Sequence, residues 1–141
     1  MIVLDVNVLI YAHNREAPHH EADKRWLEEA IVSSRPVGLP LVTSLGFLRI
    51  VTNPRAMEQP LSVATATQLL SAIRHAPAVD EIGPASGHWD RVEKTAQEAQ
   101  MSGAEMTDVH LAVLTLERGA ALATHDRGFR RIPELDILEP G

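Results

Sequence analysis

Short apolar segments alternate with longer amphipathic ones along this chain, and this alternation constrains the fold more than any other feature. Apolar runs of strand length occur at 2–6, 37–40, 76–84, 120–124 and 135–140, the last read as an edge strand. Segments that favour helices occur at 7–13, 19–34, 41–54, 62–75, 86–101 and 106–119. Because strands separated by helices pair in parallel, we predict an α/β fold. The expected architecture is a three-layer α/β/α domain with a mainly parallel central sheet, a single domain over residues 1–141.

Local patterns predict where particular residues lie within these elements. Ser62 is a suitable N-cap for the helix that follows it. The segment 106–119 is almost entirely apolar, so we expect a central helix there, and 120–124 reads as a strand buried on both faces. Trp26 and Trp89 fall on the apolar stripes of their helices. Both tryptophans are therefore predicted to lie in the core and not to serve as base-stacking platforms.

Composition narrows the classes of protein to which the chain can belong. Of its 141 residues, 45% are hydrophobic and 23% charged, which indicates a folded domain. It has no cysteine, which excludes disulfides, thiol catalysis and thiolate metal sites. No signal peptide or membrane-spanning run is recognisable, so we expect a cytoplasmic protein without membrane contact. The net charge of -6 argues against broad nonspecific binding of nucleic acid, but it leaves open a phosphate substrate held through a metal ion.

The first twelve residues, MIVLDVNVLIYA, are apolar except for Asp5 and Asn7. An ionised carboxylate in such surroundings is costly to desolvate, and it is usually paired, hydrogen-bonded or bound to a metal. Asp5 is also well placed to cap the helix that starts near Asn7. This stretch alone leaves both interpretations open.

Two further aspartates are predicted to lie at the same edge of the sheet as Asp5. Asp5 ends the first strand, and Asp126 follows the strand 120–124; Asp108 begins the helix that leads into that strand. Three carboxylates at one edge repel each other unless a cation holds them. Asp108 could instead be a favoured first-turn helix residue and Asp126 a turn residue. Taken together, the three favour a Mg²⁺ or Mn²⁺ site, which suits phosphodiester or phosphoryl chemistry.

The seven histidines are dispersed along the chain, and we interpret them as structural or exposed to solvent. His110 and His125 flank the acids, which makes them the two that could contact substrate or metal. No glycine-rich phosphate loop and no Ser-His-Asp arrangement competes with the acidic site.

With these residues placed, the chain resembles the PIN-domain ribonucleases, and specifically the VapC-type toxins of toxin–antitoxin pairs. The resemblance spans nearly the whole chain. It is carried by LDVNVLIYA, which looks like the family's opening Asp-x-Asn motif, by FLRIVTNPR, and by TDVHLAVLTLERGAALATHDRGFRRIPEL.

The resemblance implies a metal-dependent endoribonuclease that cleaves cellular RNA, often tRNA or rRNA, until a cognate VapB-like antitoxin blocks it. It also implies that Asp5, Asp108 and Asp126 are catalytic residues that bind Mg²⁺ or Mn²⁺. Asn7 and Thr124 would be supporting polar groups. Related proteins are commonly homodimers.

Two positions depart from the family pattern. The family usually has a glutamate three residues before the arginine of the third-helix motif, where this chain has Gly46 before Arg49. The family's closing Asp-x-Asp-Phe is DRGF here, with Gly128 at the second acid. We therefore expect one firmly held ion, and an Arg49 free to contact the RNA backbone or to pair with an aspartate when metal is absent.

Two other functions stay open at this point. A haloacid-dehalogenase-like phosphatase would use Asp5 as nucleophile, but it requires a second aspartate where Asn7 stands, and Lys24 and Lys94 lie on polar helix faces. A non-catalytic PIN-like module that only binds RNA or protein is favoured by Gly46 and Gly128.

Overall fold

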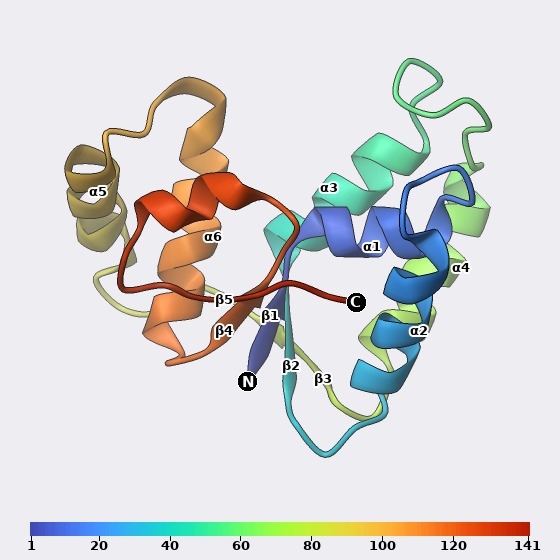
Figure 1. Cartoon of the computed structure of the whole chain (residues 1–141), viewed down its shortest axis with the longest axis horizontal. Coiled ribbons are helices and arrows are strands. Elements are labelled where there is room, and N and C mark those ends of the chain that lie inside the picture. The colour runs from blue at the N-terminus through green and yellow to red at the C-terminus, as the bar shows by residue number, and fades with distance from the viewer.

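The central sheet has five strands in the order β3-β2-β1-β4-β5, and every neighbouring pair is parallel (Figure 1). The computed structural model describes all residues from 1 to 141. The strands are short: β1 (Ile2–Leu4), β2 (Val37–Pro40), β3 (Val79–Ile82), β4 (Ala121–Ala123) and β5 (Asp136–Leu138). The α/β prediction is confirmed, and the sheet is wholly parallel instead of mainly so.

Six α-helices cover the two faces of this sheet. They are α1 (Val6–His13), α2 (His20–Ala30), α3 (Leu41–Val51), α4 (Val63–Arg74), α5 (His88–Ala99) and α6 (Met106–Glu117). Alternate residues of β1 point to opposite faces, as strand geometry requires. Ile2 and Leu4 pack in a core cluster with α1 to α4, whereas Val3 packs in a second cluster with α5 and α6. The result is the expected three-layer arrangement.

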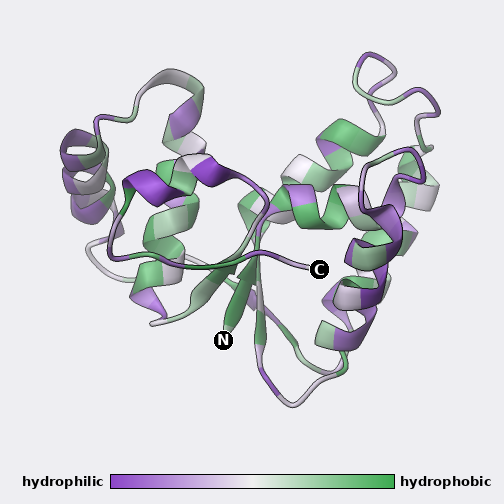
Figure 2. Ribbon diagram, in the orientation of Figure 1, coloured by the Kyte–Doolittle hydropathy of each residue, from purple (hydrophilic) through white to green (hydrophobic).

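The strands at the centre are apolar because both faces are covered (Figure 2). Val3, Leu4 and Leu122 have no exposed surface at all. β4 is buried on both faces and β5 lies at an edge, both as the sequence indicates. None of the helices combines the length and the apolar character that a bilayer crossing requires.

Most elements are shorter than their sequence patterns. The helix expected over 19–34 ends at Ala30, because the chain then turns to enter β2. Asp5 caps α1 instead of extending β1. The segment that follows β4 contains a 3₁₀ helix at Arg127–Arg131. A second one, at Gly103–Glu105, precedes α6.

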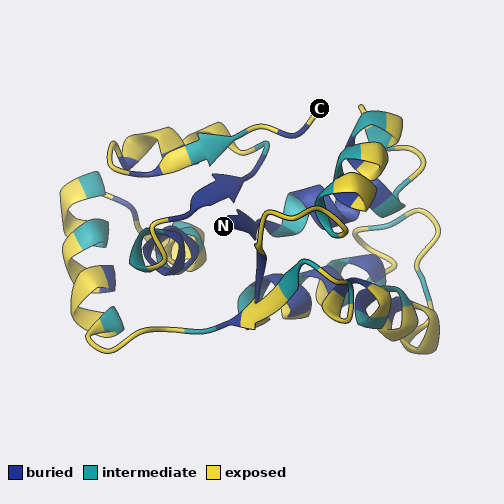
Figure 3. Ribbon diagram, turned by 90° about the horizontal axis from the view of Figure 1, so that it is seen from below, coloured by how far each residue is buried: buried dark blue, intermediate teal, exposed yellow.

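The two tryptophans do not both lie in the core, which corrects one prediction. Trp26 is partly buried and packs against the core, but Trp89 is 67% exposed. The buried stripe of α5 runs through Val92, Ala96 and Ala99, and it leaves Trp89 in solvent at the first turn. Figure 3 shows why the stripe is narrow: α5 lies at the outside of the molecule. Ser62 caps α4 as predicted, accepting a hydrogen bond from Thr65 N–H.

The strand order indicates where along the sheet a ligand site is expected. The chain adds β2 and β3 on one side of β1 and then crosses to place β4 on its other side. In open parallel sheets ligands collect at the carboxyl ends of the strands beside such a reversal. Here that point lies between β1 and β4, whose last residues, Leu4 and Ala123, are paired.

Candidate active site

Asp5 is the first residue after β1, at the reversal of strand order. Its backbone N–H donates to Ala123 O at 3.1 Å, so the sheet fixes its main chain, and the residue is only 6% exposed. Its carboxylate Oδ1 accepts a hydrogen bond from Val6 N–H at 2.6 Å. Asp5 is therefore a helix cap, as one interpretation held, and it also faces the candidate site described below.

Asn7 and Thr124 hold the second carboxylate oxygen of Asp5, the supporting role expected of them. Thr124 Oγ1 donates to Asp5 Oδ2 at 2.7 Å, and Asn7 Nδ2 donates to the same oxygen at 3.0 Å. Thr124 Oγ1 accepts from Asn7 Nδ2 at 3.2 Å and from Asp126 N–H at 3.0 Å. The side chains of Asn7 and Thr124 thus connect α1, the end of β4 and the loop of Asp126.

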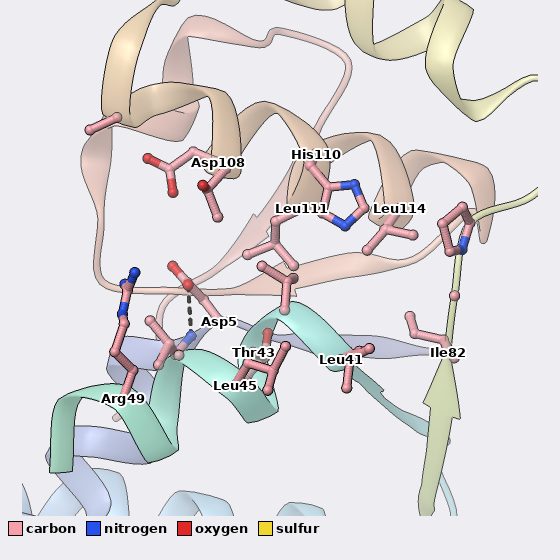
Figure 4. Close-up of a pocket in the computed structure, with 17 residues that line it drawn as sticks. Asp5, Leu41, Thr43, Leu45, Arg49, Ile82, Asp108, His110, Leu111 and Leu114 are labelled. Atoms are coloured by element: carbon pink, nitrogen blue, oxygen red, sulfur yellow. Dashed lines mark hydrogen bonds between the residues drawn. The ribbon is translucent and has the colours of Figure 1, made fainter. Parts of the chain in front are cut away.

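Asp108 faces Asp5 across a cleft of about 720 Å³ (Figure 4). It lies in the first turn of α6, which follows a capping box formed by Ser102 and Glu105. The lining residues used below come from the end of β1, from α3, from the segment after β3 and from α6: Asp5, Leu41, Leu45, Gly46, Arg49, Ile82, Pro84, Asp108, His110, Leu111 and Leu114.

Burial and neighbouring carboxylates raise the pKa values of Asp5 and Asp108. Burial, followed by the charges of Asp5, Asp126 and Glu105, raises the pKa of Asp108 to about 6. Burial also raises the pKa of Asp5, and the charge of Asp126 adds to it, although hydrogen bonds from Thr124, Val6 and Asn7 work in the opposite direction. The charge of Asp126 thus acts on both Asp5 and Asp108.

Asp126 does not line the cleft. It is exposed, and its Oδ1 accepts from Gly128 N–H at 2.8 Å, so it starts the 3₁₀ helix, as the turn alternative held. No group of three or more His, Cys, Asp or Glu side chains is close enough to hold a metal ion. Asp5 and Asp108 face each other, and Asp126 stands beside them.

Arg49 is exposed at the rim of the cleft, near Asp5 and Asp108 (Figure 4). It forms no salt bridge, and the pairing with an aspartate suggested for the metal-free protein is absent here. Its guanidinium group is therefore available to a ligand. One turn back on α3, Gly46 packs against α1: a Cβ built on it would lie 3.2 Å from Val6 Cγ2.

Comparisons with known proteins decide the family. The PIN domain family model matches residues 2–135. This chain belongs to the PIN domain family. Ribonuclease VapC43 of Mycobacterium tuberculosis is 36% identical over 140 residues, which cover 99% of this chain and 95% of that protein. This relationship sets aside the phosphatase alternative.

Solved structures show the same fold at low sequence identity. VapBC2 from Rickettsia felis, bound to a DNA fragment from its promoter, has a TM-score of 0.74 and 16% identity, and the match covers 100% of both chains. VapC20 of Mycobacterium tuberculosis, described as a sarcin-ricin loop cleaving toxin, has a TM-score of 0.69 and 12% identity, covering 92% of this chain and 93% of that one.

The carboxylate oxygens of the candidate site in this PIN domain suit a divalent cation as ligands. Asp5 Oδ1 accepts one hydrogen bond, which leaves it a lone pair. The Asp108 carboxylate receives no hydrogen bond that would offset its raised pKa. Carboxylate oxygens without enough donors, beside other carboxylates, are the ligands that Mg²⁺ and Mn²⁺ prefer. Asp5 and Asp108, which face each other across the cleft, are the residues that would hold such an ion.

The PIN domain also contains buried polar residues that sequence reasoning missed. Asp23 has no exposed surface, and its Oδ1 lies 2.7 Å from His125 Nε2. Its spacing was a usable signal, because Asp23 precedes Leu27 by four residues and so shares the buried face of α2. His88 and Glu117, whose side chains are 11% and 3% exposed, form a second group, and His88 also contacts His110. Nothing in the sequence pattern links these three residues, since they come from different helices or different turns of one helix.

Proposed function

We propose that this protein is a Mg²⁺- or Mn²⁺-dependent endoribonuclease toxin of the VapC type. Its substrate would be cellular RNA, tRNA or rRNA, and a cognate VapB-like antitoxin would neutralise it. The observation that carries the proposal is the pair Asp5 and Asp108 facing each other across the cleft. The similarity to ribonuclease VapC43 along nearly the whole chain supports it.

The residues of the site have separable roles in this proposal. Asp5, Asp108 and Asp126 hold the ion, and Asn7 and Thr124 fix the carboxylate of Asp5. When bound, the divalent ion neutralises charge on the scissile phosphate and acidifies a water. Asp108, whose pKa lies near 6, is ionised at neutral pH and available as a ligand.

Arg49 would bind a phosphate of the RNA backbone beside the reacting one. Its guanidinium is unpaired and exposed at the same rim as Asp5 and Asp108. Guanidinium groups bind phosphate oxygens through paired hydrogen bonds. Such a contact offsets the repulsion between RNA and a protein of net charge -6.

The same acidic cleft suits an inhibitor with a positive charge. We expect the antitoxin to place an arginine against Asp5 and Asp108 and to lay an apolar helix on this protein. We also expect this protein to form a homodimer. Expression beside a neighbouring antitoxin gene should restore growth and yield a complex that co-purifies. A protein that is harmless when expressed alone and binds no neighbouring product would contradict the toxin role.

The activity is tested with purified protein, defined RNAs and added Mg²⁺ or Mn²⁺. Asp108→Asn keeps the shape of the side chain but removes a charged ligand, so it should abolish cleavage and growth arrest while leaving the fold intact. Asp80→Asn is the matched control, because Asp80 is exposed on β3 away from the cleft. Cleavage by Asp108→Asn at the wild-type rate would contradict its catalytic role, and loss of its circular dichroism would indicate a structural one.

A second candidate function is RNA or protein binding without catalysis. It is favoured by Gly46 and Gly128, which lack the carboxylates usual in the family, and by the absence of a preformed cluster of three metal ligands. The same assay separates the two candidates. RNA binding without metal-stimulated cleavage would identify a binding module.

A further inference from the structure

Behind the apolar half of the cleft, three side chains form a continuous hydrogen-bonded row that the acidic site does not use. His88 Nδ1 lies 2.8 Å from Glu117 Oε2, and His88 Nε2 lies 2.7 Å from His110 Nδ1. The side chains of His88 and Glu117 are only 11% and 3% exposed. His110 alone of the three lines the cleft.

The carboxylate of Glu117 determines which atom donates and which accepts in each hydrogen bond of this row. Burial works to raise the pKa of Glu117, but hydrogen bonds from Arg91, from Ala85 N–H and from His88 outweigh it and lower that pKa. An ionised carboxylate only accepts, so His88 carries its proton at Nδ1. We assign the remaining proton by the same logic: with both rings uncharged, His88 Nε2 accepts a hydrogen bond from the Nδ1–H of His110.

One nitrogen of His110 is left without a partner in the chain. With Nδ1 donating to His88, the neutral ring presents Nε2 as a bare acceptor. The two imidazole planes are nearly perpendicular, at 85°, so His88 fixes the ring of His110 as well as its tautomer. Figure 4 shows this ring directed into the cleft, between the α6 side chains Leu111 and Leu114. A buried row of this kind holds a polar atom ready for a ligand.

The surroundings of His110 indicate what that ligand is. Leu41, Leu45, Leu111, Leu114 and Ile82 form apolar walls next to it, in the same cleft as Asp5 and Asp108. A cleft of about 720 Å³ has the size of a small-molecule site. Apolar walls accept the flat face of a base, and a bare nitrogen accepts a hydroxyl or amino proton. A phosphate group, which has no proton to donate at neutral pH, does not match this nitrogen.

We propose that His110, held by His88 and Glu117, binds a nucleotide of the RNA by accepting a hydrogen bond at Nε2 from its ribose 2′-hydroxyl or from a base amino group, and so positions the strand against Asp5 and Asp108. This role deepens the proposed ribonuclease function and rests on it. It makes His110 a substrate-binding residue, separate from the metal ligands.

The test compares His110→Phe, which keeps a flat ring but has no acceptor, with His110→Gln, whose amide oxygen restores one. His75→Phe is the matched control, because His75 is exposed at the end of α4. For an RNA that the wild type cleaves, His110→Phe should raise KM about tenfold, equivalent to ~1.4 kcal/mol, with kcat within about twofold. His110→Gln should recover part of the loss, and Mn²⁺ affinity should be unchanged in both.

Binding of fluorescent single-stranded probes identifies the donor. If the 2′-hydroxyl donates, the wild type should prefer a 12-nucleotide RNA over the DNA of the same sequence, and His110→Phe should abolish that preference. If a base amino group donates, replacing guanine by hypoxanthine and adenine by purine should weaken wild-type binding, and His110→Phe should be insensitive to the change.

Several outcomes would overturn the inference. In the kinetic assay these are an unchanged KM in His110→Phe, or a fall in its kcat alone. In the binding assay it is equal probe binding by the wild type and His110→Phe. A change confined to oligomeric mass in sedimentation would instead make the cleft an interface between copies of this chain. If the wild type cleaves no RNA, the ribonuclease proposal fails. Probe binding that depends on His110 would then still support a nucleotide site.

Discussion

His125 Nε2 lies 2.7 Å from Asp23 Oδ1, and this contact joins helix α2 to the loop that carries Asp126. Asp23 is fully buried, and its other carboxylate oxygen has no hydrogen-bond partner. The backbone N–H of His125 donates to Asn7 Oδ1, and Asn7 in turn holds Asp5. The buried Asp23 of α2 is therefore connected through His125 to two candidate metal ligands, to Asp126 as the next residue and to Asp5 through Asn7.

We predict that Asp23→Ala destabilises the protein by about 3 kcal/mol, the usual cost of leaving one member of a buried pair alone. Urea unfolding followed by circular dichroism measures it. Glu21→Ala is the control: Glu21 is in the same helix, its side chain is 83% exposed, and its loss should cost less than about 0.5 kcal/mol. Equal stabilities of the two variants would show that the Asp23 contact contributes nothing.

The contribution of Asp108 to the stability of the metal-free protein should fall as the pH rises from 4 to 7. The pKa of Asp108 is raised from an ordinary value of 3.8 to about 6, because burial and the neighbouring acids disfavour its charge. A group with a raised pKa stabilises the fold when protonated, and this contribution is lost as the pH rises through the folded-state value. Thermal unfolding of Asp108→Asn should show a flatter pH profile than the wild type. Parallel profiles would place the pKa of Asp108 near its ordinary value.

Metal binding should show the opposite dependence on pH. The ion competes with the proton on Asp108, so Mn²⁺ affinity should fall about tenfold per pH unit below 6 and level off above it. Calorimetric titration at pH 5, 6, 7 and 8 measures the affinity and the protons released. An affinity that does not change between pH 5 and 7 would exclude Asp108 as a ligand. Addition of a chelator at neutral pH should abolish cleavage.

A substitution at Gly46 tests the number of ions. With glycines at 46 and 128, we predict one firmly held Mn²⁺ in the wild type, and Gly46→Glu should raise its affinity by adding a carboxylate. The gain of about 1 kcal/mol expected from removing a helical glycine is opposed here, because the new Cβ would lie 3.2 Å from Val6 Cγ2. The double variant Gly46→Glu, Val6→Ala relieves this contact. Two tight sites in the wild type, or no gain in either variant, would show that another group supplies the missing charge.

Arg49→Ala should weaken RNA binding without affecting stability. Arg49 is exposed and has no partner in the chain, so its removal breaks nothing in the fold. Loss of one phosphate contact should weaken binding about tenfold and lower the salt slope by about 0.7 for a single strand. Arg25→Ala, on the exposed side of α2, should change neither quantity. An unchanged salt slope for Arg49→Ala would mean that the guanidinium does not contact phosphate.

The sequence by itself determined the layers of the fold and the edge of the sheet where Asp5 and Asp108 face each other. Apolar strands separated by helices require a parallel sheet with both faces covered, and Asp5, Asp108 and Asp126 each stand at an element end on the same edge. These features are local or follow from chain connectivity, so they can be read from spacing. Asn7 and Thr124 are assigned a supporting role only through the resemblance to the PIN-domain ribonucleases, because spacing alone does not single them out.

Only the tertiary structure decided which side chains meet across elements. The contacts of His88 with Glu117 and with His110, and of His125 with Asp23, join residues between 22 and 102 positions apart, and no periodicity encodes such pairs. The exposure of Trp89 depends on the position of α5 at the outside of the molecule, where it buries Val92 and leaves Trp89 in solvent. The tight fit of Gly46 against Val6 depends on how α1 and α3 pack. Helical spacing tells which face of a helix is apolar, but the neighbouring elements determine how much of that face is covered.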